Sequence, residues 1–299
     1  MNWVVLALLA PAIYAIVNFI DKHLVSNEIK DYKAMPIYTS FVALIAGTIF
    51  WFATGFPVLE TKDAAIIMAT GIITVWSLFL YFRALAEEET TTIIILFQTL
   101  PVLSLIFGYF ILGEIISTRQ LLGFILILSS AIGITIKPRK KGERIISESF
   151  FLILAFNVMW ALSGVLIKFA INANSFSEIL SYESWGIALG GAIVFILFPG
   201  IRRSFTKNLK TVKNRTLGIL FVNESVFVVA KSISFSAFAL GPVALVSVLS
   251  STQVFFGIAY GYALTKLFPK YFNEGIDKKS LIKKGVLATL LFVGIILLA

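Results

Sequence analysis

The chain contains no cysteine and only one histidine, His23, among its 299 residues. Without cysteine it cannot form disulfides, thiolate metal sites or cysteine nucleophiles, and a single histidine cannot build a histidine-rich metal site. Charged residues are also scarce, at 14% of the chain, whereas an ordinary soluble protein carries roughly 25%. These shortages argue against a soluble enzyme, and we expect neither a metal nor a cofactor.

Apolar residues are present in large excess. Hydrophobic residues make up 59% of the chain, 28 of them phenylalanine, and the mean hydropathy is +0.95. A membrane-spanning helix needs about 20 predominantly apolar residues, and backbone groups in lipid must be satisfied within the helix. The sequence therefore predicts an all-α membrane protein with ten transmembrane helices, at 2–20, 35–54, 63–84, 90–112, 119–137, 150–171, 176–198, 217–238, 242–265 and 281–298.

The two halves of the chain share a weak internal repeat. Similar residues recur in the same order, pairing Tyr14 with Trp160, Lys22 with Lys168, Tyr38 with Tyr182, Gly47 with Gly191, and Phe82 with Phe235. We expect a first five-helix repeat at 1–137, a basic linker at 138–148 and a second five-helix repeat at 149–299. Because five is odd, the repeats must be inverted in the membrane, which is characteristic of transporters with a site near the midplane.

Short motifs at corresponding places of both halves carry a family resemblance. They are Pro101, Leu112-Gly113-Glu114, Gln120-Leu121-Leu122-Gly123 and Gly133, then Leu240-Gly241-Pro242, Ser247, Thr252-Gln253, Gly257, Glu274, Gly285 and Gly294. With them the chain resembles the EamA-type ten-helix permeases of the drug/metabolite transporter superfamily, although the second half lacks Leu-Gly before Glu274. The resemblance implies transport of small metabolites through a cavity lined by the first, third, fourth, sixth, eighth and ninth helices.

The distribution of positive charge predicts the orientation. Alternate loops hold about 21 lysines and arginines, and the opposite set about three, so positive-inside bias places both termini outside. The resemblance implies termini inside, and we follow the charges. The net charge of +9 is therefore an orientation signal rather than a sign of nucleic-acid binding. We expect an integral, multi-pass protein of the plasma or inner membrane.

Charged residues inside the spans are functional candidates because burying charge in a membrane is costly. Glu224 and Lys231 are separated by about two helical turns and share one helix face. Glu183, on the preceding span, falls at similar depth, and Lys168 falls in the same leaflet. We predict a charge network of Lys168, Glu183, Glu224 and Lys231, in which a weakly paired carboxylate exchanges a proton. The alternative is a structural ion pair that fixes helix packing.

Polar and aromatic side chains on the predicted spans complete the candidate site. Tyr14 and Asn18 follow one helical stripe, and Asn157 and Trp160 follow the matching stripe of the second half. Ordinary aromatic packing is the alternative explanation. The predicted substrate-binding residues are Tyr14, Asn18, Trp76, Tyr81, Gln98, Asn157, Trp160, Glu224, Lys231 and Gln253. Glu274 is expected to order a loop, and residues 87–89 to form a solvated turn.

These features favour a secondary transporter that moves a small organic metabolite or drug by alternating access. No nucleotide-binding G-x-x-x-x-G-K-[ST] segment occurs, so a proton gradient or solute exchange would supply the energy. The expected partners are a small organic solute, membrane lipids and protons, without nucleic acid, for a monomer or a homodimer. A structural or sensory membrane subunit is the alternative, and an intramembrane enzyme is disfavoured because hydrolytic residues are missing.

Overall fold

The computed structural model describes residues 2–29, 31–112, 117–135, 147–170, 175–240, 246 and 249–298. Within these ranges the chain is helical and contains no strand. The α-helices are α1 (Trp3–His23), α2 (Met35–Ala53), α3 (Thr61–Glu87), α4 (Thr90–Phe97), α5 (Leu100–Leu112), α6 (Thr118–Thr135), α7 (Glu148–Ala170), α8 (Phe176–Leu197), α9 (Pro199–Leu209), α10 (Asn214–Leu240), α12 (Gln253–Leu267) and α13 (Lys278–Leu298). A π-helical turn (Leu24–Glu28) extends α1, and a 3-10 turn (Tyr32–Ala34) precedes α2.

The helices have the length and composition of a multi-pass membrane protein. In the described part of the chain, seven helical segments are long and apolar enough to cross a membrane: Trp3–Glu28, Tyr32–Ala53, Thr61–Glu87, Glu148–Ile167, Phe176–Leu197, Asn214–Ser234 and Lys278–Leu297. Two further apolar helices, Thr90–Leu103 and Thr118–Ile134, are shorter. A helical membrane protein is therefore confirmed, and seven of the ten predicted spans meet this criterion. The predicted basic linker lies outside the described residues except at its last two positions.

The predicted fourth span, 90–112, is not one regular helix. It is interrupted after Phe97, where the amides of Gln98 and Thr99 bond carbonyls three residues earlier, Ile95 (3.2 Å) and Leu96 (3.1 Å). Pro101 follows at once, and a proline has no N–H for the helical bond and its ring crowds the preceding turn. The break therefore has a local cause.

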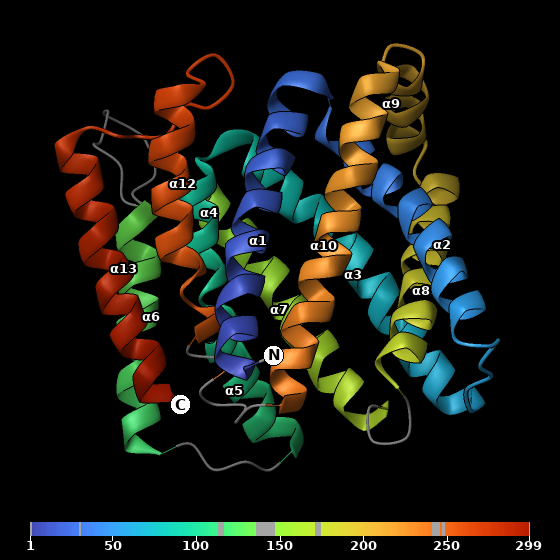
Figure 1. Cartoon of the computed structure of the whole chain (residues 1–299), viewed down its shortest axis with the longest axis horizontal. Coiled ribbons are helices and arrows are strands. Elements are labelled where there is room, and N and C mark those ends of the chain that lie inside the picture. Colours follow the sequence, from blue (N-terminus) through green and yellow to red (C-terminus); the bar gives the residue numbers. More distant parts are fainter. Residues whose placement is uncertain are drawn as a thin grey trace.

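The helices form a bundle in which elements from the two halves of the chain are in contact (Figure 1). α6 packs against α13 at one edge and α2 against α8 at the other, while α1 packs on α10 and α3 on α7 between them. The two ends of the chain lie on the same side of the bundle, and the short helix α9 lies at the opposite side.

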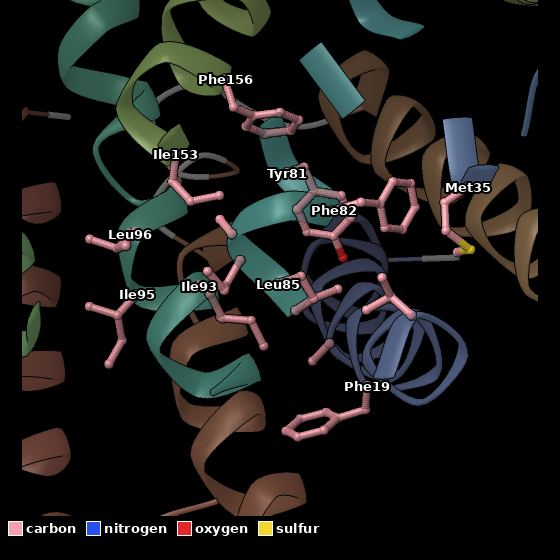
Figure 2. Close-up of a cluster of buried hydrophobic side chains, with 14 of the residues drawn as sticks. Phe19, Met35, Tyr81, Phe82, Leu85, Ile93, Ile95, Leu96, Ile153 and Phe156 are labelled. Atoms are coloured by element: carbon pink, nitrogen blue, oxygen red, sulfur yellow. The ribbon is translucent and has the colours of Figure 1, made fainter. Parts of the chain in front are cut away.

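A hydrophobic cluster holds α3 and α4 beside α1 and α7. Figure 2 shows Phe82 and Leu85 of α3 close to Ile93 of α4, with Phe19 below them. Phe19 and Phe82 are 1% and 2% exposed, and Leu85 and Ile93 are fully buried. Lipid tails are as apolar as these side chains, so close packing is what stabilises the arrangement.

Glycines allow α3 and α8 to approach at backbone distance. A Cβ atom added to Gly71 would lie 2.1 Å from the carbonyl oxygen of Glu183. One added to Gly186 would lie 2.2 Å from the carbonyl oxygen of Met68. Small residues at such crossings let membrane helices pack tightly. Neither glycine can be replaced without moving the two helices apart.

Candidate functional site

A cavity of about 890 Å³ lies at the centre of the bundle. Its walls come from α1, α3, α4, α5, α7, α10 and α12, from α2 and α8, and at single residues from α6 (Gln120) and α13 (Ile295). The first seven belong to the spans expected to line it, whereas the predicted second, fifth, seventh and tenth spans, α2, α6, α8 and α13, were not expected there. The cavity is therefore bounded by helices of both halves of the chain.

Nearly all predicted substrate-binding residues lie on this wall. They are Tyr14, Asn18, Tyr81, Gln98, Asn157, Trp160, Glu224, Lys231 and Gln253. Trp76 is not among the lining residues. Its side chain is 43% exposed, and its indole nitrogen donates to the carbonyl oxygen of Gly190 at 3.3 Å. Trp76 therefore belongs to the contact between α3 and α8 on the outer surface, and we leave it out of the site.

The predicted charge network separates into two parts. Lys231 of α10 forms a short ion pair with Glu183 of α8, whose side chain is only 7% exposed. Glu224 accepts a hydrogen bond from the hydroxyl of Thr39 at 2.7 Å instead of pairing with Lys231. Lys168 was the fourth predicted member, and its side chain lies outside the described residues. Glu183 thus has a cationic partner, and Glu224 has a neutral one.

A buried carboxylate that sequence reasoning missed lies on the same wall. Asp21 is 7% exposed and accepts hydrogen bonds from the hydroxyl of Tyr81 at 2.9 Å and the amide nitrogen of Asn223 at 2.8 Å. The chain of bonds continues through Asn18, which donates to Tyr81 at 3.0 Å and accepts from Gln253 at 3.0 Å. Five polar side chains from α1, α3, α10 and α12 are thereby connected.

A signal for Asp21 was present in the sequence. It follows Asn18 by three residues, which places it on the same helix face one turn further along. The predicted first span ends at residue 20, so Asp21 falls just outside it. The helix instead continues to His23 and then through the π-helical turn, which carries this carboxylate into the interior.

The second half contributes a polar face at the break between α4 and α5. The Asn157 amide donates to the carbonyl oxygen of Leu96 at 3.0 Å and to the hydroxyl of Thr99 at 2.7 Å. Trp160, one turn further, donates from its indole nitrogen to the hydroxyl of Ser77 at 3.0 Å. Asn157 therefore compensates for the backbone disruption near Pro101 and fixes α7 against the broken helix.

Aromatic rings cover much of the remaining wall. The rings of Tyr14 and Phe227 are 5.5 Å apart, and those of Phe156 and Trp160 are 5.2 Å apart. Phe97 packs on Phe156 at 5.3 Å. The predicted pair Tyr14 and Trp160 thus lies on one cavity, each beside a phenylalanine. Such a surface suits a ligand with a flat or apolar part.

A second charged cluster lies away from the cavity wall. Glu274 accepts from the backbone amides of Thr90 at 2.7 Å and Thr91 at 3.3 Å, which satisfies the start of α4. The buried Lys284 joins Glu274 at 3.4 Å to Glu89 at 2.6 Å. Glu274 orders a loop, as expected. The expectation of a solvated turn at 87–89 is wrong for Glu88, which is 7% exposed, and Glu89 is paired with Lys284.

The arrangement is suited to holding a ligand. Among the described residues no group of three histidines, cysteines, aspartates or glutamates could hold a metal ion. The wall presents carboxylates, amides, one ammonium and aromatic rings. A large central cavity of this kind, enclosed by membrane-type helices, is typical of solute carriers.

Comparison with protein families agrees with this class. Residues 1–136 match the EamA-like transporter family, which is part of the drug/metabolite transporter superfamily. The match covers the motifs of the first half and confirms their resemblance to this family. The match suggests a membrane transporter of the drug/metabolite type, and the family is one of transporters rather than of enzymes.

Other comparisons describe the fold of the whole chain. No curated protein matches the chain significantly. A solved structure titled "Crystal structure of protein" is similar over 98% of this chain and 94% of that one, with a TM-score of 0.54 and 14% identity. At this identity the likeness concerns the fold alone. It extends across both halves of the chain, beyond the family match.

Proposed function

We propose that this protein is a secondary transporter that moves a small organic solute through the central cavity by alternating access. The cavity of about 890 Å³, lined by polar and aromatic residues from both halves of the chain, carries this proposal. A structural or sensory membrane subunit has no need of such a space at its centre. The proposed substrate-binding residues are the lining residues given above, with the Lys231–Glu183 pair among them.

We further propose that the chain consists of two inverted five-helix repeats, at 1–137 and 149–299, joined by the linker 138–148. The helix contacts support this division. The proposed repeat pairs α1 with α7 and α3 with α10. The contact of α1 with α10 therefore corresponds to the contact of α7 with α3. α2 packs on α8 and α6 on α13, so each of these helices meets its own counterpart. A two-fold relation between the repeats would produce both kinds of contact.

The orientation proposed from the charges places both termini outside, in a plasma or inner membrane. The ends of the chain lie on one side of the bundle, and the basic helix α9 lies on the other, which supports that division of charge (Figure 1). Because the chain contains no cysteine, single cysteines can be introduced without background labelling. A cysteine at position 2 should react with an impermeant thiol reagent in intact cells, and one at Lys207 should not.

Uptake into proteoliposomes tests the proposed function. Purified protein should accumulate at least one solute from a broad panel of labelled metabolites, above empty vesicles, with a pH gradient or an internal solute as the driving force. Trp160→Phe, on the cavity wall, should reduce the uptake, whereas the same substitution at the outward Trp76 should not. No solute-dependent flux across the panel, under either driving force, would favour the subunit alternative.

A further inference from the structure

The charged groups on the cavity wall are unbalanced. Among the described lining residues, three carboxylates, Asp21, Glu183 and Glu224, face one ammonium group, that of Lys231. Lys231 is paired with Glu183. The described residues supply no cationic partner within ion-pair distance of the other two carboxylates, which come from α1 and α10. The described wall therefore carries more acidic than basic side chains.

The hydrogen-bond donors described for these two carboxylates are all neutral groups. Asp21 accepts from the Tyr81 hydroxyl and the Asn223 amide, and Glu224 accepts from the Thr39 hydroxyl. Asn223, which donates to Asp21, directly precedes Glu224 on α10. Neutral hydrogen bonds do not repay the cost of burying a charge. The pair would gain most from a positively charged ligand.

Asn223, which is bonded to Asp21 and precedes Glu224, carries an unpartnered acceptor. The side chain of Asn223 is buried, and its Oδ1 atom has no hydrogen-bond partner among the described residues. The orientation of the amide follows from its neighbour, because a carboxylate only accepts and the nitrogen must face Asp21. Asn157, also on the wall and fully buried, has an unpartnered Oδ1 as well. Each of these two buried oxygens could accept a further hydrogen bond.

An aromatic surface adjoins the same two carboxylates. Phe227 follows Glu224 by three residues on α10, and Tyr14 precedes Asp21 by two turns on α1. Their rings are in contact, and both line the cavity. Aromatic faces attract organic cations. A site for a small metal ion would instead surround it closely with oxygen ligands, and the cavity is far larger than such a site.

We propose that Asp21, Asn223 and Glu224 recognise the ammonium group of an organic amine, whose apolar part lies against Tyr14 and Phe227. The inference rests on the proposed function and names its substrate class. An ammonium group brings one positive charge and three N–H donors. The two carboxylates and the free amide oxygen together accept three such bonds. The Lys231–Glu183 pair keeps its own charges balanced and does not compete for the ligand.

A series of ligands with one ring and three head groups tests the proposal. Binding of 2-phenylethylamine, 2-phenylethanol and 3-phenylpropionate to the purified full-length protein is measured by calorimetry and by thermal shift. The amine should bind at least about tenfold more tightly than either the alcohol or the acid, since a charged hydrogen bond contributes more than a neutral one. Equal or tighter binding of the acid or the alcohol would overturn the proposal.

Two isosteric variants locate the effect. Asp21→Asn and Glu224→Gln should each weaken amine binding about 10- to 100-fold, while Glu60→Gln, an exposed residue away from the wall, should leave it unchanged. If Asp21→Asn does not fold, Glu224→Gln decides. Amine binding that is unaffected by Glu224→Gln would contradict the assignment. Uptake of neutral or anionic solutes without amine binding would refute this inference and leave the transport proposal intact.

Discussion

Two helix crossings that correspond under the proposed repeat differ sharply in this structure. α3 and α8 are in close contact through Gly71 and Gly186. The corresponding crossing, between α10 and α2, contains the Glu224–Thr39 hydrogen bond, and the residues along it line the cavity. The bundle is thus closed at one crossing and hollow at the other.

The alignment of the halves explains the difference residue by residue. The register that pairs Phe82 with Phe235 also pairs Gly71 with Glu224. The register that pairs Tyr38 with Tyr182 pairs Thr39 with Glu183 and Val42 with Gly186. A glycine therefore stands where the helices touch, and a carboxylate or a branched side chain stands where they do not. The comparison teaches that equivalent positions can be used once for packing and once for binding.

The largest expected loss of stability comes from adding a methyl group where α3 and α8 are in close contact. Gly71→Ala should lower the free energy of unfolding by about 3 kcal/mol or more, at the upper end for overpacking, because the new methyl group meets backbone rather than a flexible side chain. Thermal unfolding in detergent measures it. Gly218→Ala on α10 is the matched control, since nothing lies within 4 Å of its added Cβ and alanine favours a helix. Equal stability of the two variants would mean that α3 and α8 are not in close contact.

The next largest loss of stability should follow from breaking the Lys231–Glu183 ion pair, which joins α10 to α8. Lys231→Met leaves Glu183 buried without its partner and should cost about 1–3 kcal/mol, less than for a fully buried pair, since Lys231 is 28% exposed. The double variant Lys231→Met/Glu183→Gln should recover most of the loss in the same unfolding measurement. A double variant no more stable than Lys231→Met would show that the pair contributes little to stability.

A smaller effect is expected at the hollow crossing. Thr39→Val removes the donor to Glu224 and should cost about 0.5–1.5 kcal/mol. A double-mutant cycle with Glu224→Gln isolates the contact, and we expect the coupling to be of similar size. Coupling near zero would mean that α2 and α10 are not held together by this bond.

The double variant Ala46→Cys/Val228→Cys should show the smallest change in the free energy of unfolding. After cross-linking it should show the largest change in transport. Both residues line the cavity, one on α2 and one on α10. Before cross-linking, the double variant should stay within about 0.5 kcal/mol of the wild type. Oxidation in active proteoliposomes should form a disulfide and stop uptake, and reduction should restore it. A disulfide that leaves uptake unchanged, or that never forms, would contradict closure of this crossing during transport.

The sequence predicted those site residues whose charge makes them costly to place inside a membrane. Glu183, Glu224 and Lys231 were found in this way, and all three lie on the cavity wall. Asp21 escaped because the end of a span is poorly defined by hydropathy. Trp76 was included because its residue type alone does not tell which helix face meets the cavity.

The sequence by itself determined that this chain is a helical membrane protein that resembles the EamA-like transporters, because hydropathy and short motifs are local properties. Only the tertiary structure decided which polar groups meet. It paired Lys231 with Glu183, gave Glu224 a threonine and Asp21 a tyrosine and an asparagine, and brought glycines together at one crossing only. Such pairings depend on the distance and rotation between helices far apart in the chain. No local pattern specifies these, because they follow from the packing of all helices at once.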